Sequence, residues 1–262
     1  MRRAALLAVV GSVLLVAFAG VALAAVITCT GGRCEGTQEP DDITGTEVRD
    51  RIFALGGGDF VQAFGGDDEI NGQNGSDHIH GGGNGNDIHN GGNGPDSLEE
   101  FGTMTGRDVM NGGTDADFME GGLQGDTLRG QDGDECFSTP DFFGIEMFGD
   151  EGNDELYGNA GEDCMMGEEG TDEHYGGDNN DFIDSVSGDP PGTRDLVDCG
   201  SGFDTAVVNR EEDIVRGNCE NVDDVATTTT RVAQPAVTTD EDQQQIKDAF
   251  LQEHGLAPEP TG

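Results

Sequence analysis

The chain has 262 residues and a formal net charge of −42, from 54 Asp and Glu residues against 12 Lys and Arg residues. This charge excludes proteins that bind nucleic acid or insert at anionic membrane surfaces, because those ligands are themselves negatively charged. Glycine supplies 45 residues and only 33% of the chain is hydrophobic, so a conventional apolar core is not expected. Two interpretations remain: an acidic disordered chain, or a fold whose carboxylates are neutralised by cations.

The N-terminal segment has the pattern of a secretory signal peptide. Arg2 and Arg3 precede an apolar run from Ala4 to Ile27, and Ala22-Leu23-Ala24 is a small-x-small cleavage site. We therefore expect a signal peptide at residues 1–24, a secreted and extracellular protein, and no membrane insertion after cleavage. The apolar run is also long enough to span a bilayer, so an uncleaved anchor is the alternative.

The six cysteines all follow this segment, and an even number in an exported chain indicates disulfides. The predicted pairs are Cys29–Cys34, Cys199–Cys219 and, by elimination, Cys136–Cys164. The first pair would brace a lead-in at residues 25–44. The third pair requires both cysteines on one face of the fold, which holds if residues 139–148 loop out and fails if they form a full half-turn.

Acidic residues recur with a period of nine along the middle of the chain. Of 15 successive spacings, 11 are nine residues and the others are 10, 12, 19 and 14. The phased acids are Asp50, Asp59, Asp68, Asp77, Asp87, Asp96, Asp108, Asp117, Asp126, Glu135, Asp154, Asp163, Asp172, Asp181, Asp195 and Asp204. An apolar residue follows most of them two positions later: Ile52, Val61, Ile70, Ile79, Leu98, Met110, Met119, Leu128, Phe137, Leu156, Met165, Ile183 and Val197.

The stretches at 91–99, 149–157 and 158–166 come close to the pattern G-G-x-G-x-D-x-U-x, in which U is apolar. This pattern resembles the RTX, or haemolysin-type, calcium-binding nonapeptide repeat, over about residues 45–207. The resemblance implies an all-β, parallel β-roll (a β-helix or solenoid) with disulfide-braced ends. Alternate units would lie on the same side of a flattened coil, and the phased acids and turn carbonyls would hold Ca²⁺ between them.

The physical chemistry of one unit agrees with this resemblance. The glycine-rich half permits tight turns with positive φ, and the x-U-x half is a short strand whose U side chain points inward. Stacking places carboxylates about 4.8 Å apart, which is repulsive unless a cation lies between them. Ca²⁺ takes 6–8 oxygen ligands and fits this donor set better than Mg²⁺ or zinc. We expect on the order of 8–12 bound ions.

Departures from the repeat predict interruptions of the roll. The unit at 81–90 is one residue longer than the nine-residue period, which leaves His89 or Ile88 in the inward position. Residues 139–148 form a degenerate unit, with Met147 inward and Ile145 where the acid should be, and residues 185–193 form a loop. These breaks predict metal-loaded blocks of roughly 45–99, 103–137 and 149–184, with a closing pair at 195–207.

The histidines are not expected to form a zinc site. His78 and His80 flank the inward Ile79, so they are predicted to be solvated residues on the outer face of a strand. His174 occupies an inward position and is predicted to be packed and neutral.

The segment Cys199 to Val222 resembles the closing unit found after such repeats in secreted proteins of actinobacterial type, which implies a C-terminal cap at 208–225. Residues 226–262 are expected to form a flexible tail. Within it, residues 240–254 form either one short helix, with Ile246, Phe250 and Leu251 on its apolar face, or a disordered segment.

No catalytic motif accompanies the repeats, since neither H-E-x-x-H nor G-x-S-x-G occurs. The flanking segments are also too short for a typical catalytic domain. The sequence predicts a non-enzymatic, secreted calcium-binding roll, folded by Ca²⁺, with a structural or surface-interaction role. The alternatives are an adhesin or matrix component that binds cell-surface polysaccharide or protein, and a secreted hydrolase or accessory subunit acting on the roll surface.

Overall fold

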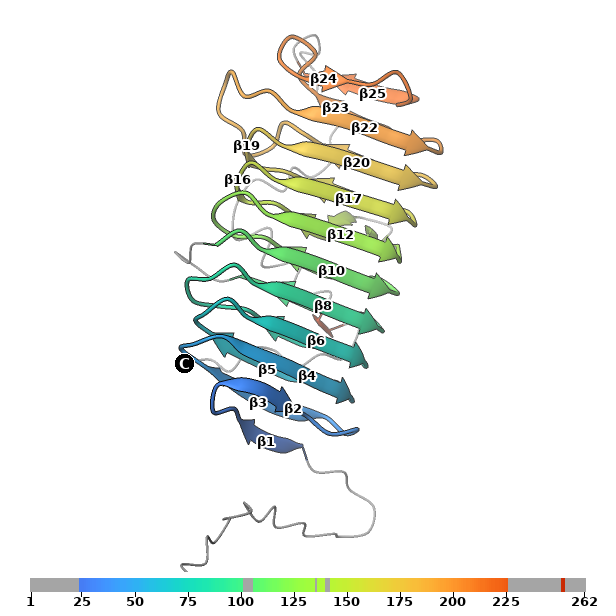
Figure 1. The fold of residues 1–262 in the computed structure, drawn as a ribbon. Coiled ribbons are helices and arrows are strands. Elements are labelled where there is room, and N and C mark those ends of the chain that lie inside the picture. The colour runs from blue at the N-terminus through green and yellow to red at the C-terminus, as the bar shows by residue number, and fades with distance from the viewer. Residues whose placement is uncertain (1–23, 101–105, 135, 140–141, 226–250, 253–262) are drawn as a thin grey trace, which may run out of the picture.

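The computed structural model describes residues 24–100, 106–134, 136–139, 142–225 and 251–252. They form a flattened coil in which the chain passes alternately between two long parallel sheets (Figure 1). Strands on the same side pair in parallel, and the commonest spacing between partners is 18 residues, as for Ile52 with Ile70. The predicted all-β parallel roll is confirmed. The predicted signal peptide lies outside the described residues.

The two long sheets account for nearly all of the strands. In spatial order, the 11-stranded sheet contains β1 (Ala25–Thr28), β3 (Asp41–Thr46), β5 (Phe60–Phe64), β7 (His78–His80), β9 (Ser97–Glu99), β11 (Phe118–Glu120), β15 (Met147–Phe148), β18 (Cys164–Met166), β21 (Phe182–Asp184), β23 (Thr205–Val208) and β25 (Asn221–Asp224). The 10-stranded sheet contains β2 (Gly32–Glu35), β4 (Asp50–Gly56), β6 (Glu69–Asn74), β8 (Ile88–Asn93), β10 (Val109–Thr114), β12 (Thr127–Asp132), β17 (Glu155–Ala160), β20 (Glu173–Asp178), β22 (Leu196–Ser201) and β24 (Ile214–Val215). Two short pairs stand apart: β13 (Cys136–Thr139) with β14 (Phe142–Ile145), and β16 (Glu151–Gly152) with β19 (Glu169–Gly170).

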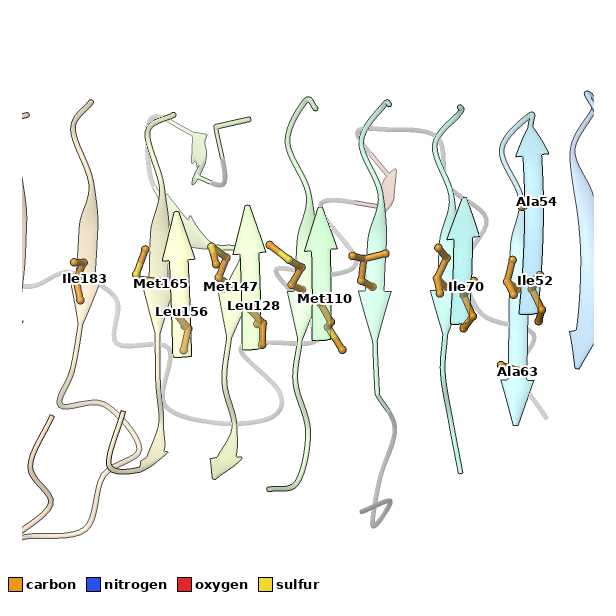
Figure 2. Close-up of a cluster of buried hydrophobic side chains, with 14 of the residues drawn as sticks. Ile52, Ala54, Ala63, Ile70, Met110, Leu128, Met147, Leu156, Met165 and Ile183 are labelled. Atoms are coloured by element: carbon orange, nitrogen blue, oxygen red, sulfur yellow. The ribbon is translucent and has the colours of Figure 1, made fainter. Parts of the chain in front are cut away.

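A thin apolar strip fills the space between the two sheets. Every second side chain of a strand points inward, and the strands of the two long sheets mostly contribute one or two core residues each. Met147, Met165 and Ile183 of the 11-stranded sheet lie beside Leu128 and Leu156 of the 10-stranded sheet (Figure 2), all with no exposed surface. This strip is too narrow for any coil to be stable alone, so each coil depends on its neighbours.

A second apolar cluster lies on the outer face of the 11-stranded sheet. Phe118, Phe148, Cys164 and Met166 are buried there together with Leu251. Leu251 belongs to the predicted apolar face of the tail helix, and residues 251–252 are helical. The remainder of that predicted helix lies outside the described residues. This part of the sheet is therefore buried on both faces.

One predicted inward residue is wrong. Phe137 pairs with Gly144 in the antiparallel hairpin of β13 and β14, and Met147 occupies the inward position between Met119 and Met165. The nine-residue phase runs through Phe137 by coincidence, because the chain leaves the coil at β13.

The hairpin resolves the alternatives for the third disulfide. Because β13 and β14 form a pair outside the two long sheets, Cys136 reaches Cys164 with a Cα–Cα distance of 4.9 Å. The other two predicted pairs are also present, with Cα–Cα distances of 5.6 Å for Cys29–Cys34 and 5.3 Å for Cys199–Cys219.

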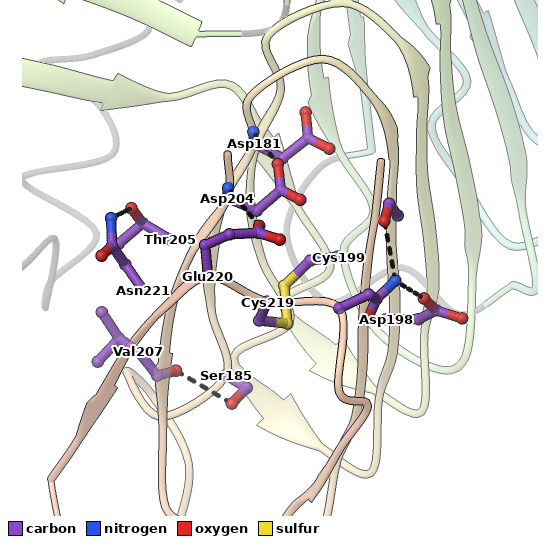
Figure 3. The surroundings of a disulfide bond; sticks show 12 residues. Asp181, Ser185, Asp198, Cys199, Asp204, Thr205, Val207, Cys219, Glu220 and Asn221 are labelled. Carbon is purple, nitrogen blue, oxygen red and sulfur yellow. Dashed lines mark hydrogen bonds between the residues drawn. A yellow bond between two sulfur atoms is a disulfide. The ribbon is translucent and has the colours of Figure 1, made fainter. Parts of the chain in front are cut away.

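The parallel coil extends on both sides of residues 45–207. It begins at β1 and ends at β25, which pairs with β23. Figure 3 shows the last coil, where Cys219 is bonded to Cys199 of β22. In the same coil the side chain of Asn218 donates to that of Asp198. Within the described residues, no helix is long and apolar enough to cross a bilayer.

Candidate metal centres

The phased aspartates lie in the turns, two residues before each inward side chain. The backbone N–H of Asp154, for example, donates to Oδ1 of Asp172 in the next coil at 2.9 Å. The same bond recurs from coil to coil with lengths of 2.6 to 3.2 Å. It produces a ladder of carboxylates along each of the two edges of the roll, and both carboxylates of this example are almost completely buried.

The ladder that leads into the 10-stranded sheet is continuous. It contains Asp50, Asp68, Asp87, Asp108, Asp126, Asp154, Asp172, Asp195 and Asp213. The bond from Asp126 to Asp154 spans 28 residues, so the hairpin does not interrupt this edge. The predicted division into separate blocks is therefore wrong for this edge of the roll.

The ladder that leads into the 11-stranded sheet has two segments. The first contains Asp41, Asp59, Asp77, Asp96 and Asp117, and the second contains Asp163, Asp181, Asp204 and Glu220. Between them, the register of Met147 assigns the acid position to Ile145, as predicted from the sequence. Glu135, the other predicted ligand in this region, lies outside the described residues.

Three ladder residues are absent from the sequence prediction. Asp41 lies nine residues before Asp50 and Asp213 lies nine residues after Asp204, so the same period identifies both. Glu220 lies outside the period, because the last turn is shorter, and only the structure identifies it through its bond from the N–H of Asp204 at 3.1 Å.

The second carboxylate oxygen is buried without a hydrogen bond in most interior coils. This holds for Oδ2 of Asp59, Asp68, Asp77, Asp96, Asp117, Asp126, Asp154, Asp172, Asp181, Asp195 and Asp204. A row of buried anionic oxygens is costly unless a cation or proton satisfies it. These oxygens are therefore the positions at which the structure requires a partner.

Glycines form the opposite wall beside these oxygens. A Cβ placed on Gly149 would lie 2.7 Å from Oδ2 of Asp154 and 2.7 Å from the carbonyl oxygen of Gly167 in the next coil. The carboxylate and the carbonyl therefore converge on space that only glycine leaves open. Carboxylate and carbonyl oxygens from successive coils are the ligands that Ca²⁺ prefers.

Burial raises the pKa of these carboxyls, because the charged form loses its hydration. Each N–H bond from the preceding coil opposes this rise, and neighbouring carboxylates add to it. The pKa is about 6 for Asp68, Asp77 and Asp108, about 7 for Asp59, Asp87 and Asp172, about 8 for Asp96, Asp154 and Asp181, and about 9 for Asp126 and Asp195. Near neutral pH, without metal, part of the ladder carboxyls would therefore be protonated.

A comparison with family models identifies these turns. The model of the RTX calcium-binding nonapeptide repeat matches residues 44–79, 65–98, 103–134 and 146–173. Within these residues the repeats match those of the RTX calcium-binding family. A comparison with curated proteins found no match. The RTX repeats thus coincide with the interior of both ladders, and the ladders continue beyond the last matched repeat to Asp213 and Glu220.

The ends of the RTX ladders are satisfied by side chains of the protein. The backbone N–H and hydroxyl of Thr46 both donate to Oδ2 of Asp50 at 2.8 Å. The N–H of Thr37 donates to Oδ2 of Asp41 and its hydroxyl donates to Oδ1, and the N–H of Asn209 donates to Oδ2 of Asp213 at 2.7 Å. These contacts occupy Oδ2, the oxygen that remains open in most interior coils, whereas Oδ1 of Asp50 is buried without a hydrogen bond.

One interior coil departs from the RTX pattern. Glu100 stands where other repeats have glycine, and its buried carboxylate lies 3.1 Å from Nε2 of His89. His89 is the inward residue, while Ile88 is exposed, which resolves the two alternatives from the sequence. Burial lowers the pKa of His89, but the Glu100 carboxylate outweighs it and the net pKa is raised. Asp87 lies beside this pair.

The remaining histidines divide between a confirmed and a wrong prediction. His174 is fully buried in the core, and burial lowers its pKa to about 4, so it is neutral as predicted. His78 and His80 point outward as predicted, but each is only 2% exposed. The prediction that they are solvated is wrong, because the outer face of β7 is covered.

Proposed function

We propose that this chain is a secreted calcium-binding β-roll protein without catalytic activity, whose folding is coupled to Ca²⁺ binding and whose role is structural or in surface interaction. The observation that carries the proposal is the row of buried Oδ2 atoms without hydrogen bonds, opposite converging backbone carbonyls. The family match to calcium-binding repeats over the same turns supports it independently.

The proposed ligands are the interior ladder aspartates together with turn carbonyls of the adjacent coils. When bound, Ca²⁺ supplies the positive charge that these carboxylates otherwise lack. Lys and Arg do not replace it, because the Arg–carboxylate ion pairs of the described residues involve only exposed or half-exposed arginines. Among the phased acids, Asp50 is already bonded to Thr46, and Glu135 stays a prediction from the sequence.

Coupled folding follows from the balance of burial and charge. Each coil contributes a thin apolar strip and two carboxylates, so without cations the repulsion opposes stacking. Only the stacked form brings the ligands together, so the free energy of Ca²⁺ binding stabilises the folded chain alone and couples folding to metal binding. We expect site affinities of roughly 10⁻⁴–10⁻³ M, suited to extracellular calcium, with cooperativity between adjacent coils.

Circular dichroism of the chain from residue 25 onward tests the coupling. The β signal should appear on adding Ca²⁺ and disappear on adding EGTA, and Mg²⁺ at the same concentration should not restore it. Calorimetric titration should give several bound ions per chain. A β content that EGTA leaves unchanged would contradict the proposal.

Three disulfides support an extracellular location, because such bonds persist in oxidising compartments. Fractionation of the producing cells, with mass spectrometry of the N-terminus, tests secretion and cleavage after Ala24. A chain retained with residues 1–24 intact would favour the membrane-anchored alternative.

A polysaccharide-binding role is the second candidate. A hollow of about 280 Å³ lies along β8, β10 and β12, lined by the polar side chains of Asn90, Asn111, Thr114, Gln131 and Asp132. Amide and hydroxyl groups of this kind suit a ligand rich in hydroxyls. A pull-down with cell-wall polysaccharide in Ca²⁺ should lose signal in Asn111→Ala and keep it in Thr205→Ala, on the other sheet. Equal retention by both variants would remove this candidate.

A further inference from the structure

Glu100 brings a carboxylate into a turn where the neighbouring coils have glycine. It follows β9 at the place that Gly81 occupies after β7 and Gly121 occupies after β11, as the pairing of these three strands shows. Its side chain reaches back to the preceding coil, where the N–H of Gly82 donates to Oε2 at 3.0 Å. This bond holds the carboxylate in place while the other oxygen, Oε1, lies beside His89.

His89 brings a nitrogen to the same space. Its imidazole is the inward side chain of β8 and has no exposed surface. Nε2 lies 3.1 Å from Oε1 of Glu100, yet neither of these two atoms makes a hydrogen bond. Both atoms face Gly81, where an added Cβ would collide with each of them. The imidazole and the carboxylate therefore converge on one position without the geometry of a hydrogen bond between them.

The donor atoms of this turn differ from those of the calcium turns. At Gly149, on the same edge of the roll, an added Cβ would meet two oxygens, Oδ2 of Asp154 and the carbonyl of Gly167. At Gly81 it would meet an imidazole nitrogen and a carboxylate oxygen. Ca²⁺ prefers oxygen ligands alone, whereas Zn²⁺ binds imidazole nitrogen together with carboxylate oxygen. The change of donors favours a different ion at this coil.

Asp87 completes a set of three ligands. One ligand atom from each of Asp87, His89 and Glu100 lies within 4.8 Å of the other two, and the three residues are only 2%, 0% and 5% exposed. Ligand atoms bound tetrahedrally to one zinc ion at 2.0–2.1 Å are about 3.3 Å apart, close to the 3.1 Å between Nε2 of His89 and Oε1 of Glu100. The three side chains are therefore within reach of a single ion.

The negative charge around this position exceeds what one histidine can balance. Besides burial, which is the main cause, the carboxylate of Glu100 raises the pKa of the ladder carboxyls Asp68, Asp87 and Asp108. Its charge thus lies among theirs, and a protonated His89 would supply only one positive charge to the group. A divalent ion supplies two, and it binds the neutral form of the imidazole.

We propose that Asp87, His89 and Glu100 form a Zn²⁺ site within the ladder of the 10-stranded sheet, at a coil position where the other turns take Ca²⁺. Three protein ligands leave one coordination position for a water molecule. The ion would join the coil of β8 to the coil that follows it. The inference rests on the proposed calcium function only for the ions at the other coils.

Cobalt, which occupies zinc sites and absorbs visible light, provides the test. The full chain is refolded from an EDTA-treated stock in excess Ca²⁺, which fills the oxygen-only sites, with one equivalent of Co²⁺ present because the site is buried. The spectrum should show the intense bands of a four- or five-coordinate ion, and one equivalent of Zn²⁺ added with the Co²⁺ should suppress them. These bands are read whether or not the β signal depends on Ca²⁺, so the zinc site and calcium-coupled folding can fail separately.

Two substitutions each remove one ligand and introduce the residue type that other coils carry. His89→Leu places an apolar side chain between Ile70 and Met110 of the adjacent strands, and Glu100→Gly gives this turn the glycine of its neighbours. Each variant should therefore still fold in Ca²⁺, which circular dichroism checks. Each should weaken Zn²⁺ binding at least about tenfold, since loss of an outer-shell partner alone has that effect.

His174→Leu is the matched control, because His174 is another buried inward histidine of the same sheet. It lies on β20 in register with Leu156 and Val197, and its replacement should leave the bands and the Zn²⁺ affinity unchanged. Absence of the bands in the unaltered chain would show that His89 and Glu100 pair without a metal. Equal Zn²⁺ binding by all three variants would place the ion elsewhere, and either result would overturn the proposal.

Discussion

At the scale of single residues, one carboxylate performs two tasks with its two oxygens. Oδ1 of Asp172 accepts the N–H of Asp154 and so fixes the spacing of the coils, while Oδ2 is left buried without a hydrogen bond. Accepting the N–H with Oδ1 needs only an acceptor. Binding a cation with Oδ2 also needs the negative charge of the carboxylate. A substitution that keeps the acceptor and removes the charge separates the two.

Asp154→Asn makes this separation, because an amide oxygen still accepts the bond from Asp126. In Ca²⁺ the variant should lose a ligand and require a several-fold higher Ca²⁺ concentration to fold. Without Ca²⁺, at a pH above the Asp154 pKa of about 8, it should gain about 1–3 kcal/mol of stability, because a buried charge without a partner is removed. Ca²⁺ titrations followed by circular dichroism measure both effects. The control is Asp132→Asn, whose side chain is exposed; a similar change in both variants would contradict the assignment.

Gly149→Ala tests the wall opposite the carboxylate. Its Cβ would lie 2.7 Å from Oδ2 of Asp154 and from the carbonyl of Gly167, so we expect a loss of about 1–3 kcal/mol from overpacking and weaker Ca²⁺ binding. In Gly217→Ala the added Cβ has no neighbour within 4 Å, and it should leave both properties unchanged. Thermal unfolding in saturating Ca²⁺ compares the two variants, and equal unfolding temperatures would show that the turn tolerates a side chain.

At the scale of elements, the hairpin of β13 and β14 is an addition to the roll. β12 pairs with β17 in the 10-stranded sheet, and β11 pairs with β15 in the 11-stranded sheet, so both sheets continue past the hairpin. The disulfide to Cys164 joins its first strand to the coil.

Replacement of both Cys136 and Cys164 by serine should therefore free the hairpin and leave the roll folded. The disulfide closes a loop with a sequence separation of 28, for which chain entropy gives about 3.5 kcal/mol of stability. The Cys29 and Cys34 double serine variant, with a separation of 5, should lose only about 2 kcal/mol. Unfolding in Ca²⁺, with limited proteolysis within 136–145, measures both. Loss of Ca²⁺-dependent β structure in the first variant would show that the hairpin is part of the coil.

The sequence predicts those elements that depend on the period, and misses those set by contacts between distant segments. The inward positions of Ile52 and Leu156 follow from phase alone. Phe137 keeps the phase but lies in the hairpin. The sequence prediction fails there because residue spacing alone does not show that the chain leaves the coil and returns. The burial of His78 and the carboxylate beside it depend on strand pairing and on what covers the sheet, neither of which the nine-residue unit encodes.

At the scale of the whole molecule, the two ladders make stability depend on protons as well as on metal. The folded metal-free carboxyls have pKa values of about 6 to 9, above the usual value of about 3.9 for the unfolded chain. A raised pKa contributes stability that is complete below the unfolded value and is lost as pH rises through the folded values. Protons and Ca²⁺ therefore stabilise the same stacked form.

The metal-free chain should accordingly hold more β structure at pH 4 than at pH 8, and lose it progressively between about pH 4 and the folded pKa values of about 6 to 9. The apparent Ca²⁺ affinity should rise across the same interval, because binding displaces protons. Circular dichroism in EGTA across this range measures the loss of β structure. The protein concentration is kept low, because the isoelectric point is about 4.1 and a chain with little net charge associates. Calorimetry in buffers of different ionisation enthalpy measures the displaced protons. A β content that increases with pH in EGTA would contradict the pKa directions.

The direct pairing of β12 with β17 has a practical consequence for protein engineering. Although 22 residues separate the end of one strand from the start of the other, the bond from Asp126 to Asp154 has the same 2.7 Å length as that from Asp108 to Asp126, where no hairpin intervenes. The roll thus tolerates an insert of variable length on one edge while the opposite edge keeps its spacing. The connection between β13 and β14 is the natural place to graft a foreign peptide for display on a calcium-controlled scaffold.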